Sequence, residues 1–160
     1  MNEIYIFDLD DTIVIHENNT VNYDKMNPDE TLHNLIKKLD TKELYIYTNG
    51  TYDHAELCLK KIKLFNIFQI FARDTIPSMK PYISSYYHVQ KRILKEKYYN
   101  NDNKMIFFDD NYENLRSAKR MGWITVWIHP KFTDKQKYMD YSFPNIYQAL
   151  LYFTINKGSI

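Results

Sequence analysis

The sequence has few of the features that mark secreted or membrane-spanning proteins. Cys58 is the only cysteine among 160 residues, so no internal disulfide can form. This is typical of a reducing compartment, and we expect the protein to be cytoplasmic. No apolar run approaches the length of a bilayer span, so no membrane partner is expected. Residues 1–4 show no basic region leading into an apolar run, and we therefore expect no secretory signal there.

The chain also lacks a dominant charge. Its 21 basic and 20 acidic residues leave a formal net charge of +1, which provides no global field for holding nucleic acid. Local basic runs such as 131–137 leave nucleic-acid contact open, but solvated surface is the simpler interpretation. Hydrophobic residues make up 44% of the sequence, enough for a substantial core, so we expect one domain over residues 1–160.

Short apolar runs and amphipathic stretches alternate along the chain. The expected strands cover 4–7, 44–47, 69–72, 105–108 and 123–128. The expected helices begin near Asn27-Pro28, Tyr52, Pro81, Tyr112 and Pro144. This alternation predicts an α/β fold with a doubly wound, Rossmann-like parallel sheet and flanking helices. One stretch differs: the β-prone runs 13–16 and 20–23 flank a turn-like segment, which predicts a small β-hairpin flap.

Polar side chains that can take part in catalysis or ligand binding lie just after the predicted strands. Ligands of open α/β sheets bind beyond the carboxyl ends of the strands, so residues placed there are expected to meet at one edge. The first strand is followed by two acids, the second by a hydroxyl and an amide, and the fourth by two more acids, while one lysine precedes the third helix. The candidate site residues are Asp8, Asp10, Thr48, Asn49, Lys80, Asp109 and Asp110.

Carboxylates crowded in this way repel one another, and a divalent cation relieves the repulsion. With oxygen ligands and no nearby cluster of histidine or cysteine in the sequence, Mg²⁺ is favoured over zinc. Asp8 and Asp109 are the expected carboxylate ligands, and the backbone carbonyl of Asp10 is a third candidate. For Asp110, direct coordination and an indirect role are equally supported by the sequence.

The remaining residues suit the transfer of a phosphoryl group. Lys80 supplies a positive charge and Thr48 a hydroxyl donor for phosphate oxygens. Asp8 is expected to be a covalent nucleophile, and Asp10 the general acid and base that protonates the leaving oxygen and then activates water. Asn49 could donate to the substrate phosphate or orient its own loop.

Four segments, in order, resemble the motifs of the haloacid dehalogenase superfamily of phosphatases. They are Phe7-Asp8-Leu9-Asp10-Asp11-Thr12, Tyr47-Thr48-Asn49-Gly50, Lys80-Pro81 and Phe107-Phe108-Asp109-Asp110-Asn111. The resemblance covers about 4–129. It implies the same fold, a nucleophilic Asp8 with Asp10 as acid and base, and phosphate contacts from Thr48 and Lys80. It also implies Mg²⁺ held by Asp8, Asp10 and Asp109. Asp110 would be a further ligand, direct or through water, or would orient Lys80. An aspartate at the Asp10 position favours phosphatases over dehalogenases.

Family members often carry a cap domain between the first two motifs. The hairpin and the helix after it fill most of the interval from Thr12 to Thr48, so we expect a capless protein with an open site. The pattern is most similar to capless magnesium-dependent phosphatases and to pyrimidine 5′-nucleotidases. The substrate is therefore a phosphorylated compound of unknown class.

Two other functions compete with a general phosphomonoesterase. One is a phosphatase acting on nucleotides or nucleic-acid ends, and the other is a non-catalytic module that binds a phosphorylated ligand. Four further side chains at the expected rim could contact substrate, although each is interpreted individually as packing or solvated: His16, Tyr23, Tyr52 and His54.

Overall fold

Six parallel strands form the centre of the molecule. The computed structural model describes residues 2–41, 44–95 and 103–160. Its sheet has the strand order β3-β2-β1-β4-β5-β6. The strands are β1 (Asn2–Phe7), β2 (Leu44–Tyr47), β3 (Gln69–Phe71), β4 (Asn103–Asp109), β5 (Ile124–Ile128) and β6 (Tyr141–Phe143).

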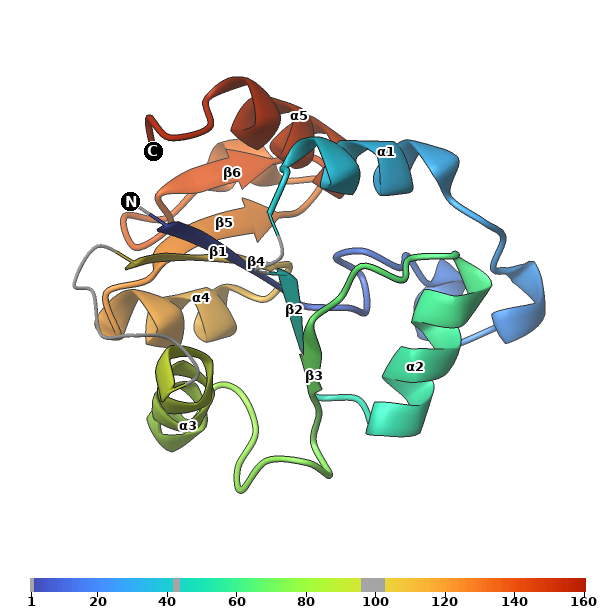
Figure 1. Ribbon diagram of the computed structural model, residues 1–160, viewed down its shortest axis with the longest axis horizontal. Helices are drawn as coiled ribbons and strands as arrows, with labels where there is room; N and C mark the ends of the chain where they lie inside the picture. Colours follow the sequence, from blue (N-terminus) through green and yellow to red (C-terminus); the bar gives the residue numbers. More distant parts are fainter. Residues whose placement is uncertain (1, 42–43, 96–102) are drawn as a thin grey trace.

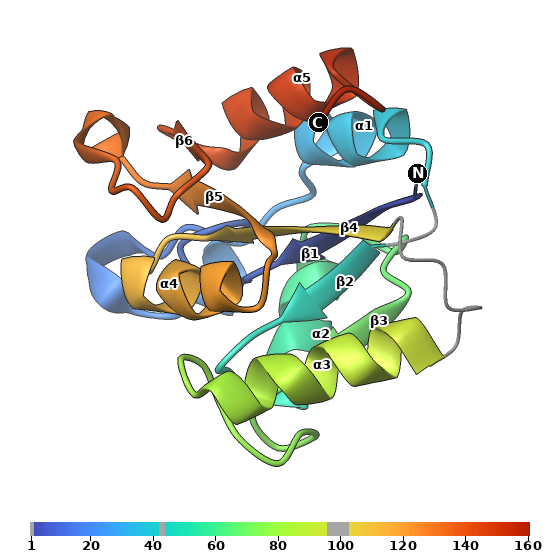
Figure 2. The same cartoon turned by 90° about the vertical axis from the view of Figure 1, so that its left-hand side faces the viewer.

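Helices cover both faces of this sheet. They are α1 (Glu30–Lys38), α2 (Tyr52–Lys61), α3 (Ile83–Lys95), α4 (Tyr112–Arg120) and α5 (Ile146–Ile155). Helices α1 and α5 pack together above the sheet and α3 and α4 lie below it (Figures 1 and 2). The predicted doubly wound α/β fold is confirmed. Within the described residues, no helix has the length and apolar character needed to cross a bilayer.

The central strand β1 is buried on both sides because its alternate residues enter two different cores. Tyr5 and Phe7 pack with residues of α1, α2 and α5, whereas Ile4 and Ile6 pack with residues of α3 and α4. A strand covered on both faces reads as a continuous apolar run rather than an alternating one. That is why the segment before Asp8 could be assigned from sequence.

The strand order reverses between β1 and β4, and this reversal positions the site. The chain builds β1, β2 and β3 outward to one edge and then returns to place β4 beside β1. Phe7 of β1 pairs with Phe108 of β4, so the next residues, Asp8 and Asp109, leave the sheet side by side. The Asp8 amide also donates to the Phe108 carbonyl at 2.8 Å. Ligands of open α/β sheets bind at such a switch point.

The predicted β-hairpin flap is wrong. Between Asp8 and Glu30 the chain forms two short 3₁₀ turns, η1 (Glu17–Asn19) and η2 (Tyr23–Lys25), and no strand. Ile13 and Val14 are adjacent in sequence and both are buried, whereas a hairpin flap with one face in solvent would bury only one of them. Their amides instead donate to the Leu9 carbonyl at 2.9 and 3.0 Å, which coils the segment back on itself. This segment between β1 and α1, called the insertion below, is thus a compact loop and contains no full cap domain.

Two predicted helix starts also shift by one or two residues, and in each the structure shows which side chain caps the helix. Helix α1 is capped by Asp29, whose carboxylate accepts from the Leu32 amide at 2.8 Å, rather than by Asn27. Helix α5 is capped by Asn145, which accepts from the Gln148 amide at 3.0 Å. Side chains of this kind satisfy amides that the first helical turn leaves free.

The aromatic packing of α5 provides a test of the fold. Phe153 is fully buried and contacts Tyr5 and Phe108 edge-on, with ring centroids 6.3 and 5.2 Å away. Phe153→Ala should lower the free energy of unfolding by about 3–5 kcal/mol because it leaves a cavity in the core. Ile155→Ala on the same helix, where the side chain is 74% exposed, should change it by less than about 0.5 kcal/mol. Urea denaturation measures both, and equal effects would contradict the packing described.

Candidate active site

The Lys80 ammonium lies at the centre of the site. Its Nζ donates to Asp8 Oδ1 at 2.7 Å and to Asp109 Oδ2 at 2.8 Å. The residue is only 3% exposed, and its Nζ also lies 5.1 Å from the Tyr47 ring centroid. Burial alone would lower the pKa of Lys80, but the charges of Asp109 and Asp8 outweigh it and hold the pKa above its usual value. Lys80 is therefore a permanent cation between two acids.

Asp8 is placed at the end of β1 with both carboxylate oxygens engaged. Oδ1 accepts from Lys80, and Oδ2 accepts from the Thr12 hydroxyl at 3.1 Å. Thr12 is fully buried, and its hydrogen bond to Asp8 holds the loop after β1 in place. Burial raises the pKa of Asp8 to about 8; Lys80 opposes this rise and Asp109 adds to it. A single ammonium is insufficient compensation for the acids around it.

Asp109 is fully buried at the end of β4 and is fixed by several donors. Besides Lys80, its oxygens accept from the Asn111 amide at 2.8 Å and from Asn114 Nδ2 at 3.0 and 3.1 Å. Sequence analysis missed the role of Asn114. The feature that could have revealed this role is its place in the first turn of α4, the helix that follows the strand end carrying Asp109.

A third carboxylate completes an acidic cluster. One oxygen each of Asp8, Asp109 and Asp110 lie within 4.8 Å of one another. Burial raises the pKa of Asp110 to about 7, and the charges of Asp109 and Asp11 add to the rise. Three carboxylates share one ammonium here, and a hard divalent cation bound by oxygen fits this donor set. The structure therefore brings together Asp8, Asp109 and Asp110 but groups Asp10 with two histidines instead, and Mg²⁺ itself stays a prediction.

The loop after β2 contributes Thr48 and Asn49. Thr48 is buried, and its hydroxyl accepts from the Gly50 amide at 3.0 Å. Both ends of the Asn49 amide contact the Lys80 backbone: Nδ2 donates to its carbonyl at 2.9 Å, and Oδ1 accepts from its amide at 3.0 Å. The expected roles of Asn49 were phosphate contact or orientation of its own loop, whereas these contacts hold the Lys80 backbone. Phosphate contact by Thr48 and Asn49 remains a prediction.

Asp10 directs one carboxylate oxygen at two histidines. Its Oδ1 lies 2.5 Å from His16 Nε2 and 2.8 Å from His54 Nε2. The Tyr23 hydroxyl lies 2.7 Å from the other ring nitrogen of His54. The sequence suggested the Asp10 backbone carbonyl as a further ligand of Mg²⁺. That contact remains a prediction.

Local structure explains how the histidines reach Asp10. Asp11 takes a left-handed backbone conformation, φ 59°, and its carboxylate accepts from the His16 amide at 3.1 Å, which folds His16 back. His54 lies in the first turn of α2, where Thr51 accepts from its amide at 3.3 Å. Gly50 leaves room for it, since a Cβ at Gly50 would lie 2.9 Å from His54 Cδ2. Sequence analysis placed both histidines at the rim but missed their joint contact.

No protein-family model matches the chain, but solved structures do. The L-2-haloacid dehalogenase from Xanthobacter autotrophicus with chloropropionic acid covalently bound has a TM-score of 0.64 and 14% identity, over 85% of this chain and 64% of that one. A dehalogenase in an intermediate complex has a TM-score of 0.61 and 21% identity, over 77% and 53%. The chain has the haloacid dehalogenase fold. At these identities the likeness concerns the fold alone, and the chain spans less than two thirds of either dehalogenase.

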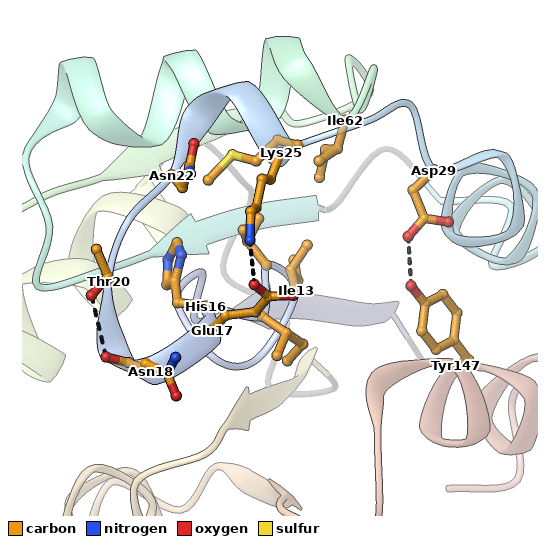
Figure 3. Close-up of a pocket in the computed structure, with 13 residues that line it drawn as sticks. Ile13, His16, Glu17, Asn18, Thr20, Asn22, Lys25, Asp29, Ile62 and Tyr147 are labelled. Carbon is orange, nitrogen blue, oxygen red and sulfur yellow. Dashed lines mark hydrogen bonds and ion pairs between the residues drawn. The ribbon is translucent and has the colours of Figure 1, made fainter.

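A pocket of about 420 Å³ lies beside the insertion, and one of the residues that line it, His16, contacts Asp10. It lies between the 3₁₀ turns of the insertion and the helices α1 and α5, and His16 forms part of its wall (Figure 3). Asp29 and Tyr147 close one side with a hydrogen bond of 2.6 Å, and Lys25 and Glu17 pair across the other part at 2.6 Å. The pocket lining is mixed, with apolar side chains such as Ile13 beside amides and hydroxyls.

Removal of the Lys80 charge tests the electrostatics of the site. Lys80→Met leaves Asp8 and Asp109 buried without a counter-charge, which should cost about 3–5 kcal/mol of unfolding free energy. Because the folded pKa of Asp8 is raised, the folded state binds more protons than the unfolded state below that pKa, and stability falls as pH rises. Without Lys80 the pKa of Asp8 should rise further, so the unfolding free energy should continue to fall up to a higher pH.

The destabilisation should therefore be larger near pH 8 than near pH 5, where protonation relieves the buried acids. The matched control is Lys60→Met, a change at an exposed lysine of α2 that should have little effect at either pH. Thermal or urea unfolding at the two pH values provides the comparison. A destabilisation by Lys80→Met that does not depend on pH would contradict the charge arrangement.

Proposed function

We propose that this protein is a Mg²⁺-dependent phosphohydrolase that cleaves phosphomonoesters through a phosphorylated Asp8. The proposal is supported above all by the separation of two acids that lie two residues apart. Asp8 is buried against Lys80, whereas Asp10 turns its carboxylate to His16 and His54 and is 32% exposed in its side chain. A nucleophile and an acid–base group need such different surroundings because the first must form a bond to phosphorus while the second must exchange protons.

In the first step, a carboxylate oxygen of Asp8 attacks the phosphorus atom, and the bond from phosphorus to the leaving oxygen breaks. The carboxylic acid of Asp10 gives its proton to that leaving oxygen. Lys80 is placed to attract the phosphoryl oxygens as negative charge builds on them. The products of this step are the free alcohol and phosphorylated Asp8.

In the second step, the Asp10 carboxylate takes a proton from water while the water oxygen attacks phosphorus. The bond from phosphorus to Asp8 breaks, inorganic phosphate leaves and the Asp8 carboxylate is restored. Asp10 regains its proton, so each residue ends the cycle as it began. One group serves as acid and then as base, which suits the exposed position of Asp10.

Mg²⁺ would be held by Asp8, Asp109 and Asp110, and when bound it would neutralise these acids and the phosphoryl charge. The chain's own contribution is to keep Asp109 ready as a ligand through Asn114 and the Asn111 amide. The proposed place for the leaving group is the pocket of mixed polarity whose wall includes His16, the residue that contacts Asp10. That pocket favours an organic phosphate of modest size over a phosphate on a flat macromolecular surface.

Phosphate release from a generic aryl phosphate tests the proposed function. Asp8→Asn should abolish turnover, and Asp10→Asn should lower kcat by about 10²–10⁴-fold because proton transfer is lost. Asp53→Asn, the same change at an exposed residue of α2, serves as the control and should retain activity. Equal rates for the Asp8→Asn protein and the unmodified protein would rule the proposal out.

The same assay separates the competing functions. Turnover of nucleotides or of end-phosphorylated DNA, with affinity that falls steeply as salt rises, would assign the nucleic-acid alternative. Measurable affinity for a phosphorylated ligand without any phosphate release would assign the binding module. Halide release from a 2-haloacid would assign the activity named for the proteins of similar fold.

Mg²⁺ binding should depend on pH because two of its expected ligands have raised pKa values. Asp8 and Asp110, with pKa values of about 8 and about 7, carry protons at pH 6 that the metal must displace. Mg²⁺ at a hundred times its Kd should stabilise the protein by about 2.7 kcal/mol, and reaching that saturation should take less Mg²⁺ near pH 8.5 than near pH 6.

Thermal unfolding and proton release on addition of Mg²⁺ measure this effect. Asp110→Asn should weaken binding and remove part of the proton release near pH 7. A melting temperature that Mg²⁺ leaves unchanged at both pH values would argue against a site at these acids.

A further inference from the structure

A second group of metal-binding atoms lies beside the acidic cluster. It consists of Asp10 Oδ1, His16 Nε2 and His54 Nε2, which lie within 4.8 Å of one another. The three residues come from different parts of the fold: the end of β1, the insertion and the first turn of α2. Both imidazoles direct the same ring nitrogen at the same carboxylate oxygen. Two nitrogens and one oxygen form the donor set of a typical open zinc site.

We propose that Asp10, His16 and His54 bind a second divalent cation of the nitrogen-preferring kind, such as Zn²⁺, and that its binding switches off the acid–base function of Asp10. The binding part of this proposal is independent of the phosphatase activity. The inhibitory part rests on the proposed function of Asp10. The site is distinct from the one expected for Mg²⁺, which uses oxygen donors from Asp8, Asp109 and Asp110.

The distances require only a small rearrangement. Zn–N and Zn–O bonds of about 2.0–2.2 Å in tetrahedral geometry place the donor atoms about 3.3 Å apart. The observed separations of Asp10 Oδ1 from the two Nε2 atoms are 2.5 and 2.8 Å, so each must widen by less than about 1 Å. His16 belongs to the insertion loop rather than to a strand or helix, so it can move by this amount without breaking the sheet.

The surroundings of His54 have the features of a metal-binding histidine. Such residues donate their second ring N–H to an oxygen, which fixes the ring and the tautomer. The Tyr23 oxygen lies 2.7 Å from His54 Nδ1 and is placed to accept that proton when Nε2 binds a metal. The His16 and His54 side chains are 6% and 13% exposed, whereas that of Asp10 is 32% exposed. The two histidines are therefore buried in the protein, while the Asp10 carboxylate leaves the site open to solvent.

The choice of metal is set by the donors. Imidazole nitrogen suits zinc, copper, nickel and iron, whereas Mg²⁺ prefers oxygen and keeps much of its water. Each site should therefore select its own ion, although they share the loop after β1. A cation bound at Asp10 Oδ1 stabilises the ionised carboxylate and opposes its protonation, so hydrolysis should stop while Asp8, Lys80 and Asp109 remain intact.

The binding test uses the chelator-treated full chain with Mg²⁺ present throughout. Calorimetry with Zn²⁺ should show one tight site, and Co²⁺ should give the intense visible bands of a low-coordinate site with nitrogen ligands. The double change His16→Gln with His54→Gln should weaken Zn²⁺ binding by at least ~100-fold. Tyr23→Phe should weaken it by about 10–100-fold, as loss of a partner behind a metal-binding histidine does. His88→Gln on α3 is the matched control and should bind as the unmodified protein does.

Zn²⁺ binding that the double change leaves unaltered would overturn the proposal, as would the absence of a tight site in the unmodified protein. Should the double variant fail to fold, X-ray absorption of the Zn²⁺-loaded unmodified protein decides. The zinc ligands should then include imidazole, and a spectrum without imidazole scattering would overturn the proposal. In the aryl phosphate assay, Zn²⁺ should inhibit the unmodified and His88→Gln proteins equally. A protein that binds Zn²⁺ through His16 and His54 but shows no phosphatase activity would refute the proposed function and leave the proposed zinc site standing.

Discussion

The contact of one buried ammonium with two carboxylates underlies the whole site. Lys80 Nζ is the only described cation that reaches Asp8 and Asp109, and it does so from a segment that comes after β3. The contact joins three parts of the chain: the end of β1, the end of β4 and the loop that precedes α3. Asn49 extends the connection to β2 by holding the Lys80 backbone from both sides. The order of the strands brings these ends together, and the lysine holds them there.

The charge balance that results is incomplete, and this gives the site its chemical character. Buried acids with one shared cation have raised pKa values, as at Asp8 and Asp110, and such groups take up either protons or a metal ion. Asp10 has other contacts although it is only two residues from Asp8, because its carboxylate meets His16 and His54 beside the turn at Asp11. Two acids on one loop thus have separate partners, which is the condition for giving them separate roles.

The sequence was sufficient for the parts of the molecule that depend on regular patterns. The buried strand before Asp8 is an apolar run, and parallel strands deliver the residues at their carboxyl ends to one edge, so the grouping of Asp8, Asp109 and Lys80 could be predicted. The insertion could not, because Ile13 and Val14 satisfy a strand pattern while their backbone folds onto Leu9. The contact of His16 and His54 with Asp10 depends on that coiled loop and on the space at Gly50, neither of which leaves a periodic signal.

The central claim is that Asp8 becomes covalently phosphorylated, and trapping the intermediate tests it most directly. The Asp10→Asn protein lacks the base that activates water, so the phosphorylated enzyme should accumulate after mixing with an aryl phosphate and Mg²⁺. Rapid acid quenching followed by mass spectrometry should find one added phosphoryl group on the peptide that contains Asp8, and none when Asp8 is also changed to Asn. A phosphoryl group on another residue, or substrate turnover with no covalent intermediate, would contradict the account.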